Sequence, residues 1–223
     1  MAISKRLQKI AEYTKEYNSL ADIACDHGYL GIYAAINYDI KDILLTDINP
    51  MPLASAIKNT ESKNLSSVIK CKLGNGLAPL DKDYEVITIS GIGGILMTEI
   101  LSDGLMRAKG SKRLVLCPNT DSYEVRKFLM ENGFKIVDEA MVFEHKYYEI
   151  IVCEYKNDNI SYTELELKYG PFLLKNRPVE FINYYKEQLS LFEKRITNIF
   201  EGNAKIKLQN KIDEIKVILN NIL

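Results

Sequence analysis

No run of about 18 apolar residues occurs anywhere in the 223 residues, so the sequence offers no helix long enough to cross a membrane. The N-terminal segment also lacks the apolar stretch and small-residue cleavage site of a secretory signal. We therefore expect a cytoplasmic protein without membrane contacts. The formal net charge is −1, with 29 Lys and Arg against 30 Asp and Glu, so binding of nucleic acid requires a local basic patch.

Paired cysteines are missing as well. The four cysteines, Cys25, Cys71, Cys117 and Cys153, include no C-x-x-C pair, and each stands at or near the end of an expected strand. Isolated cysteines in a chain without a secretory signal are typical of reduced thiols rather than of disulfides or metal ligands. We therefore expect no disulfide and no metal site.

A G-x-G-x-x-G dinucleotide loop is missing from Leu20 to Leu30, the stretch around which the chain is organised. This stretch, LADIACDHGYL, passes from an apolar run through a short turn into a second apolar run, which predicts strand, turn and helix. In open α/β sheets such a turn lies where ligands bind. Its small-residue positions are Ala24, Asp26 and Gly28, and the carboxylate repels a pyrophosphate. S-adenosylmethionine suits the turn better, because its sulfonium and ammonium groups are cationic.

Six further strands are expected after this turn, four alternating with helices and two forming a closing hairpin. Their ranges are residues 41–47, 66–73, 84–90, 112–116, 134–143 and 147–155. An amphipathic helix over residues 3–14 precedes the first strand. The pattern predicts an α/β fold with the Rossmann-like sheet of a class I S-adenosylmethionine-dependent methyltransferase. A nicotinamide dehydrogenase would continue with a sixth parallel strand instead.

Three later turns of this sheet carry candidate ligand groups. Asp47 ends the second strand about 20 residues after the first turn, where a carboxylate holds ribose hydroxyls in such folds. Its alternative role is an acid at a helix N-terminus. Asn75, between two glycines, is either an adenine-binding amide or an ordinary loop residue. Gly91-Ile-Gly-Gly94 opens a helix, so its backbone N–H groups can approach a ligand closely.

Beyond Tyr155 the strand pattern stops and two helical stripes follow. Their apolar residues are Phe181, Tyr184, Tyr185, Leu189, Phe192, Ile196 and Ile199, then Ile206, Leu208, Ile212, Ile215, Leu219 and Ile222. Gly202 and Asn203 separate the stripes, which predicts an antiparallel, coiled-coil-like hairpin. We predict two domains, a methyltransferase domain over residues 1–156 and the helical hairpin over residues 157–223. The hairpin is an RNA-docking arm, a dimerising arm or a stabilising cap; of the oligomeric states, a monomer is favoured.

Several motifs are distributed over nearly the whole chain. They are Ser4-Lys-Arg-Leu7, Asp26-His-Gly-Tyr-Leu30, Gly74 to Leu77, Gly91-Ile-Gly-Gly94, Pro118-Asn119, Tyr147-Tyr-Glu-Ile-Ile151 and the helical C-terminal arm. Together they resemble the TrmK family of bacterial tRNA (adenine-N1)-methyltransferases. The resemblance implies methyl transfer from S-adenosylmethionine to N1 of the D-loop adenine at tRNA position 22.

Four residues depart from the pattern of that family. Ala24 stands where glycine is usual, Gly31 replaces a proline, Asn75 replaces an aspartate and Cys117 replaces a glutamine. The extra methyl group of Ala24 is tolerable if its φ angle is negative. Asn75 keeps a hydrogen-bond acceptor but loses the charge. None of the four removes a group that the chemistry requires.

The proposed chemistry assigns catalytic roles near the first turn. Adenine N1 must be unpaired or flipped out to react, and the methylated base is cationic. A fixed carboxylate therefore stabilises the product charge and accepts a hydrogen bond from the exocyclic amine, and we assign this role to Asp26. The alternative for Asp26 is capping of the turn. His27 orients Asp26, contacts RNA or is structural, and Tyr29 stacks on the base or packs under the helix. Asn119 holds the adenine edge.

The cofactor site is predicted around the same turns. Its residues are Arg6, Asp22, Cys25, Asp26, Asp47, Ile48, Asn75, Gly76, Gly91 and Gly93. Arg6 pairs with either the methionine carboxylate or an RNA phosphate. The turn after the fourth strand reads Ser90-Gly-Ile-Gly and is not the Asn/Asp-Pro-Pro-aromatic turn of amino-directed adenine methyltransferases, which favours attack by a ring nitrogen.

Two other functions remain open at the sequence level. One is a methyltransferase acting on a small molecule, with the C-terminal hairpin as a lid. The other is a degenerate, non-catalytic methyltransferase fold whose hairpin binds a partner. The first predicts no binding of tRNA, and the second predicts no binding of cofactor.

Overall fold

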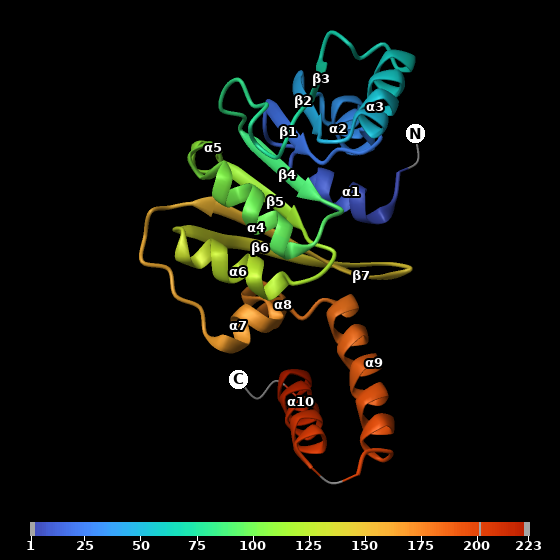
Figure 1. Ribbon diagram of the computed structural model, residues 1–223, viewed down its shortest axis with the longest axis vertical. Coiled ribbons are helices and arrows are strands. Elements are labelled where there is room, and N and C mark those ends of the chain that lie inside the picture. Colours follow the sequence, from blue (N-terminus) through green and yellow to red (C-terminus); the bar gives the residue numbers. More distant parts are fainter. Residues whose placement is uncertain (1–2, 201, 221–223) are drawn as a thin grey trace. The chain divides into compact units, whose positions relative to one another are not determined.

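The computed structural model describes residues 3–200 and 202–220. The chain divides into two compact units, Met1–Phe172 and Leu173–Leu223. The first is an α/β unit and the second is helical (Figure 1). The predicted domain boundary after residue 156 falls in the polar segment that follows the last strand, and it stays a prediction.

A seven-stranded mixed sheet forms the first unit, in the order β3-β2-β1-β4-β5-β7-β6. Its strands are β1 Ser19–Ile23, β2 Asp42–Asp47, β3 Ile69–Leu73, β4 Val86–Ser90, β5 Arg113–Cys117, β6 Phe134–Glu144 and β7 Lys146–Tyr155. β1 to β5 are parallel, while β7 is antiparallel to both β5 and β6. The predicted Rossmann-like methyltransferase sheet with a closing hairpin is confirmed.

Helices cover both faces of this sheet. They are α1 Lys5–Glu12, α2 Tyr29–Tyr38, α3 Pro50–Ser62, α4 Gly94–Asp103, α5 Leu105–Gly110 and α6 Ser122–Glu131. Alternate strand side chains enter two core layers, so Ile43 joins residues of α1 to α3 and Leu44 joins residues of α4 to α6. All five residues of β1 are buried, because helices cover it on either side. β2 and β5 likewise contain continuous apolar runs in the sequence, whereas the edge strand β3 carries Lys70 and Lys72.

Within residues 157–200 and 202–220 the chain forms four helices, of which the sequence predicted two. α9 Val179–Ile196 and α10 Asn203–Leu219 form the expected pair, and α10 runs back beside α9 (Figure 1). Phe181 and Tyr185 of α9 are buried, but Ile206, predicted on the apolar stripe of α10, is 60% exposed. Ile199 follows the end of α9, and Ile222 lies outside the described residues.

Two short helices, α7 Glu164–Tyr169 and α8 Pro171–Asn176, precede this pair and were not predicted. Six residues are too few to show a helical period. A capping box is the signal that was missed for α7, because Thr163 and Glu166 exchange side-chain and backbone hydrogen bonds. No helix within residues 3–200 and 202–220 combines the length and apolar character needed to span a membrane.

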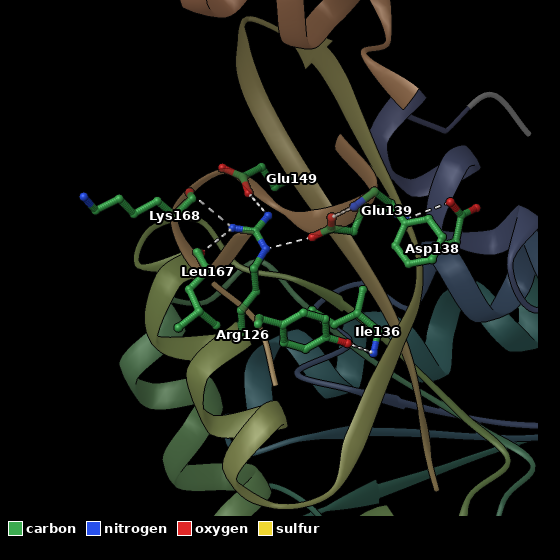
Figure 2. Close-up of polar contacts among 9 residues, drawn as sticks. Arg126, Ile136, Asp138, Glu139, Glu149, Leu167 and Lys168 are labelled. Carbon is green, nitrogen blue, oxygen red and sulfur yellow. Dashed lines mark hydrogen bonds and ion pairs between the residues drawn. The ribbon is translucent and has the colours of Figure 1, made fainter. Parts of the chain in front are cut away.

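A fully buried arginine joins α6 to the β6–β7 hairpin (Figure 2). The Arg126 Nε donates to Glu139 Oε1 at 2.7 Å, and the guanidinium also pairs with Glu149. A further nitrogen of Arg126 donates to the carbonyl of Leu167 in α7 at 3.2 Å. Glu139 in turn accepts from the backbone N–H of Phe172 at 2.9 Å. This charged cluster ties three segments of the first unit together.

Candidate active site

A cavity of about 540 Å³ opens at the carboxyl ends of β1, β2 and β4, a size typical of small-molecule sites. It gathers most of the residues that the sequence singled out. Those that line it are Arg6, Asp22, Cys25, Asp26, His27, Tyr29, Asp47, Ile48, Asn75, Gly76, Gly91 and Asn119. Gly93 is the one predicted residue that does not line it. Residues from the turns after five strands, β1 to β5, therefore meet in one place.

The turn after β1 has an unusual backbone in which every second residue is left-handed. Ala24, Asp26 and Gly28 have φ angles of 56°, 51° and 72°. A Cβ at Gly28 would lie 2.7 Å from a methyl group of Leu45, so only glycine lets this turn pack on β2. The condition under which the extra methyl group of Ala24 is tolerable, a negative φ, is therefore not met. The backbone of Ala24 has a left-handed conformation, which is energetically unfavourable for an L-residue because of its Cβ.

We predict that Ala24→Gly stabilises the protein by about 1 kcal/mol, because glycine adopts positive φ without steric cost. Thermal or denaturant unfolding measures this directly. The matched control is Ala34→Gly, since Ala34 is buried within α2 and glycine there should destabilise by about 1 kcal/mol. Equal destabilisation by both substitutions would contradict the strain at Ala24.

Asp47 holds the first turn while facing the cavity. Its Oδ2 accepts the backbone N–H of Asp26 at 3.1 Å, and its Oδ1 accepts the N–H of Asn49 at 2.8 Å. Asp47 can therefore serve both as an acid at a helix N-terminus and as a ligand of ribose hydroxyls, because each carboxylate oxygen keeps a further lone pair. That remaining capacity suits ribose hydroxyls, which can donate to it.

Asp22 lies beneath the turn as a buried carboxylate. Its side chain accepts the hydroxyl of Thr88 at 2.8 Å. Burial raises the pKa of Asp22 to about 7; the Thr88 hydrogen bond opposes the rise and the charge of Asp47 adds to it. Two acidic groups at the base of the cavity therefore favour a cationic ligand.

Asp26 stands at the cavity wall with its carboxylate available. Its side chain is 68% exposed, and Oδ1 lies 3.5 Å from Nε2 of His27. Within the described part of the chain, no backbone N–H donates to this carboxylate, so nothing supports the turn-capping alternative. The His27 ring in turn lies 5.5 Å from the ring of Tyr29, centroid to centroid. Acid, imidazole and phenol thus form a row along one wall.

Asn119 connects the turns after β4 and β5. Its Nδ2 donates to the carbonyl of Gly91 at 2.6 Å, and its backbone N–H donates to that of Ile92 at 2.8 Å. The side-chain oxygen of Asn119 remains an acceptor. Gly93, which does not line the cavity, faces the neighbouring turn instead, since a Cβ there would lie 3.4 Å from Oγ1 of Thr120.

The cavity residues that the sequence analysis missed include Tyr148 of β7 and Thr46 of β2. The guanidinium carbon of Arg6 lies 4.7 Å from the ring centroid of Tyr148. Nε and one terminal nitrogen of Arg6, and the hydroxyl of Thr46, are buried without hydrogen-bond partners. Buried donors of this kind call for a ligand with an anionic group. No periodicity could have indicated Tyr148, because only strand pairing brings it here.

The comparisons with known proteins agree with this geometry. The TrmK family model, described as tRNA (adenine(22)-N(1))-methyltransferase, matches residues 20–220.

This chain belongs to the TrmK family.

The tRNA (adenine(22)-N(1))-methyltransferase of Bacillus subtilis is 31% identical over 98% of this chain and 96% of its own. Streptococcus pneumoniae Sp1610 in complex with S-adenosyl-L-methionine superposes with a TM-score of 0.88 at 32% identity, over 98% of this chain and all of that one. M. capricolum TrmK in complex with S-adenosyl-homocysteine superposes with a TM-score of 0.85 at 28% identity, over 99% of both chains.

One departure from the TrmK pattern, Gly31, has a local structural reason. A Cβ at Gly31 would lie 2.5 Å from a methyl group of Leu45, so Leu45 fills the space that a proline ring needs. Cys117 is buried, which raises the pKa of its thiol to about 11 despite the nearby Arg6. All four cysteines are free. Within residues 3–200 and 202–220 no three His, Cys, Asp or Glu side chains gather as a metal site.

The cavity of this TrmK-family chain fits S-adenosylmethionine on its own groups. Asp22 and Asp47 supply negative charge for its cationic and hydroxyl groups, and Arg6 has unpartnered nitrogens for a carboxylate. The same two carboxylates would repel the negative charges of a pyrophosphate. The donor set therefore matches a zwitterionic amino acid joined to a nucleoside.

Proposed function

We propose that this protein transfers a methyl group from S-adenosylmethionine to N1 of adenine 22 in the D-loop of tRNA. The observation that carries the proposal is the exposed carboxylate of Asp26 on the wall of a cavity that fits this methyl donor. Membership in the TrmK family supports the same reaction.

The cofactor-binding roles are proposals that follow from the geometry. Asp47 accepts hydrogen bonds from the ribose hydroxyls, and Asn75 pairs with the adenine edge of the cofactor. Asp22 faces the ammonium group, and the unpartnered nitrogens of Arg6 take the carboxylate. The remaining proposed contacts come from the backbone and apolar atoms of Cys25, Ile48, Gly76 and Gly91.

When bound, S-adenosylmethionine supplies a methyl group already activated by its sulfonium. The N1 lone pair of the target adenine attacks this carbon as the carbon–sulfur bond breaks, so the positive charge moves to the adenine. Asp26 stabilises that charge and accepts from the exocyclic amine. His27 orients Asp26, Tyr29 stacks on the base and Asn119 holds its edge. The protein contributes position and electrostatics rather than a covalent intermediate.

The test is methyl transfer from labelled S-adenosylmethionine to unmodified bacterial tRNA, followed by nucleoside analysis. We expect N1-methyladenosine, lost when adenine 22 is replaced by guanine. Cofactor binding without any tRNA product would favour the small-molecule methyltransferase. Absence of cofactor binding would favour the non-catalytic, partner-binding alternative.

Asp22 gives the cofactor site a predicted pH dependence. Since its pKa is about 7, the carboxylate is largely neutral at pH 6 and charged at pH 8. We expect S-adenosylmethionine affinity to rise over this interval, and Asp22→Asn to weaken binding about tenfold at pH 8 and much less at pH 6. Titration calorimetry measures both. A flat wild-type profile would remove Asp22 from the ammonium site.

Stability supplies the control for Asp22→Asn. The folded pKa lies above the ordinary value of 3.8, so ionisation of Asp22 lowers stability as the pH rises from about 4 through 7. At pH 8 the asparagine variant should therefore melt at the same temperature as the wild type or higher. A weaker cofactor affinity cannot then be ascribed to unfolding.

Partners and location follow from the substrate. We propose that the protein acts on tRNA in the cytoplasm and does so as a monomer. We also propose two domains divided after residue 156, with the C-terminal helices as an arm that docks tRNA. Gel filtration of the free protein checks the oligomeric state.

A further inference from the structure

The tip of the β6–β7 hairpin extends beyond the sheet at the edge where the cavity opens (Figure 1). β5 ends at Cys117 and its last pair with β7 is Leu116 with Ile151. The two hairpin strands continue pairing beyond that point, as far as Glu144 with Lys146. His145, at φ 65°, closes the turn between them. A narrow two-stranded ribbon therefore projects beside the cavity mouth.

One face of this tip is joined to the active site. Lys146 Nζ lies 3.5 Å from the carbonyl of Asn119 and 4.8 Å from the ring centroid of Tyr148. Arg6 stacks on the same ring, and Tyr148 lines the cavity. The tip thus places a cation against the part of the cavity wall formed by Asn119 and Tyr148.

The opposite face carries an aromatic pair in which Phe143 is exposed and Tyr147 is half-buried. Phe143 and Tyr147 are directly opposite each other in the ladder, with ring centroids 4.8 Å apart. Because strand side chains alternate, this pair lies on the other face of the ribbon from Tyr148. Phe143 is 51% exposed, although burying a phenylalanine stabilises a protein by about 2 kcal/mol. An exposed ring at this place is suited to stacking on a nucleobase.

We propose that the hairpin tip is the wedge that separates the target adenine from its neighbour in the tRNA. Phe143 and Tyr147 take the neighbouring base on one face, and Lys146 neutralises the phosphate between the two nucleotides. The target adenine passes to the other face and enters the cavity past Tyr148. This inference rests on the proposed methylation of tRNA.

The physical reason for such a wedge is the cost of unstacking. Extruding a base costs a few kcal/mol, and apolar side chains placed between bases offset that cost. Stacking of one base on an aromatic ring contributes about 1–3 kcal/mol. A cation at the intervening phosphate adds a salt-dependent attraction.

Phe143→Ala tests the stacking face. We expect kcat/KM for tRNA to fall about tenfold or more, with restoration in Phe143→Trp, while the S-adenosylmethionine dissociation constant stays unchanged. The specific readout is a tRNA with an abasic site on one or the other side of the target adenine. On the side where the wedge acts, the abasic tRNA should abolish the difference between Phe143→Ala and wild type. Additive losses on both sides would overturn the proposal.

Lys146→Gln tests the phosphate contact, with Lys109→Gln as its control. The Nζ of Lys109 also lies 4.8 Å from a ring centroid, that of Tyr155, but Tyr155 is at the end of β7 away from the hairpin tip. Lys146→Gln should reduce the slope of log affinity against log salt by about 0.7, and Lys109→Gln should leave it unchanged. Equal slopes in both variants would overturn the phosphate role. Failure of the proposed function itself is distinguishable, because then the wild type would not methylate tRNA at all.

Discussion

Asp26→Asn should lower kcat for tRNA methylation by about 100-fold or more and change S-adenosylmethionine affinity by less than about threefold. The substitution keeps the size and planarity of the side chain and removes only its charge. That charge is needed once the adenine becomes cationic, and much less when the cofactor binds. Single-turnover kinetics with saturating tRNA, together with calorimetric binding of the cofactor, separates the two effects.

Asp39→Asn is the matched control for this substitution. Asp39 has the same left-handed backbone, with φ 55°, and its side chain is 82% exposed at the other end of α2. Its replacement changes the net charge equally and should leave kcat within about twofold. A normal kcat in Asp26→Asn would exclude the charge-stabilising role, and a large loss of cofactor affinity would place Asp26 in the cofactor site alone.

Arg126→Leu should destabilise the protein by about 3–5 kcal/mol, the largest effect on stability that we expect from one residue. The guanidinium and Glu139 are fully buried, and Glu149 is largely so. Burial lowers the pKa of Arg126, but the carboxylates of Glu149 and Glu139 outweigh it and hold that pKa above its ordinary value. Removing the arginine leaves two carboxylates without their cation and frees the carbonyl of Leu167. Denaturant unfolding measures the loss.

Two controls separate the buried charge from ordinary loss of packing. The triple variant Arg126→Leu, Glu139→Leu, Glu149→Leu removes the whole cluster and should recover much of the lost stability. Lys9→Met breaks an exposed ion pair with Glu12 and should change stability by less than about 1 kcal/mol. If the triple variant is less stable than Arg126→Leu alone, desolvated charge is not the cause.

The order and type of the main elements followed from the sequence. The strands β1 and β4 are mainly apolar, and the helices between them begin at recognisable turns. The acid that ends β2 and the glycines around Asn75 could be placed at one edge, because parallel strands all end on the same side of a sheet. Twelve of the thirteen predicted site residues therefore line one cavity, although their roles remain proposals.

Other features depended on the folded chain. The φ of Ala24 is positive because the turn must bring the backbone N–H of Asp26 to Asp47, which lies 21 residues away. Tyr148 reaches the cavity through the antiparallel pairing of β7, and no local pattern contains that information. The same holds for Arg126, whose sequence position in α6 looks like that of any surface arginine.

The sequence by itself determined the alternation of strands and helices, the closing hairpin and the polar turns that face a ligand, because these depend on periodicity and on residues close in the chain. Only the tertiary structure decided which cation meets which carboxylate, which backbone is strained and which face of the hairpin borders the cavity. Those properties depend on distances between segments far apart in the chain, and they are set when the two core layers close around the sheet.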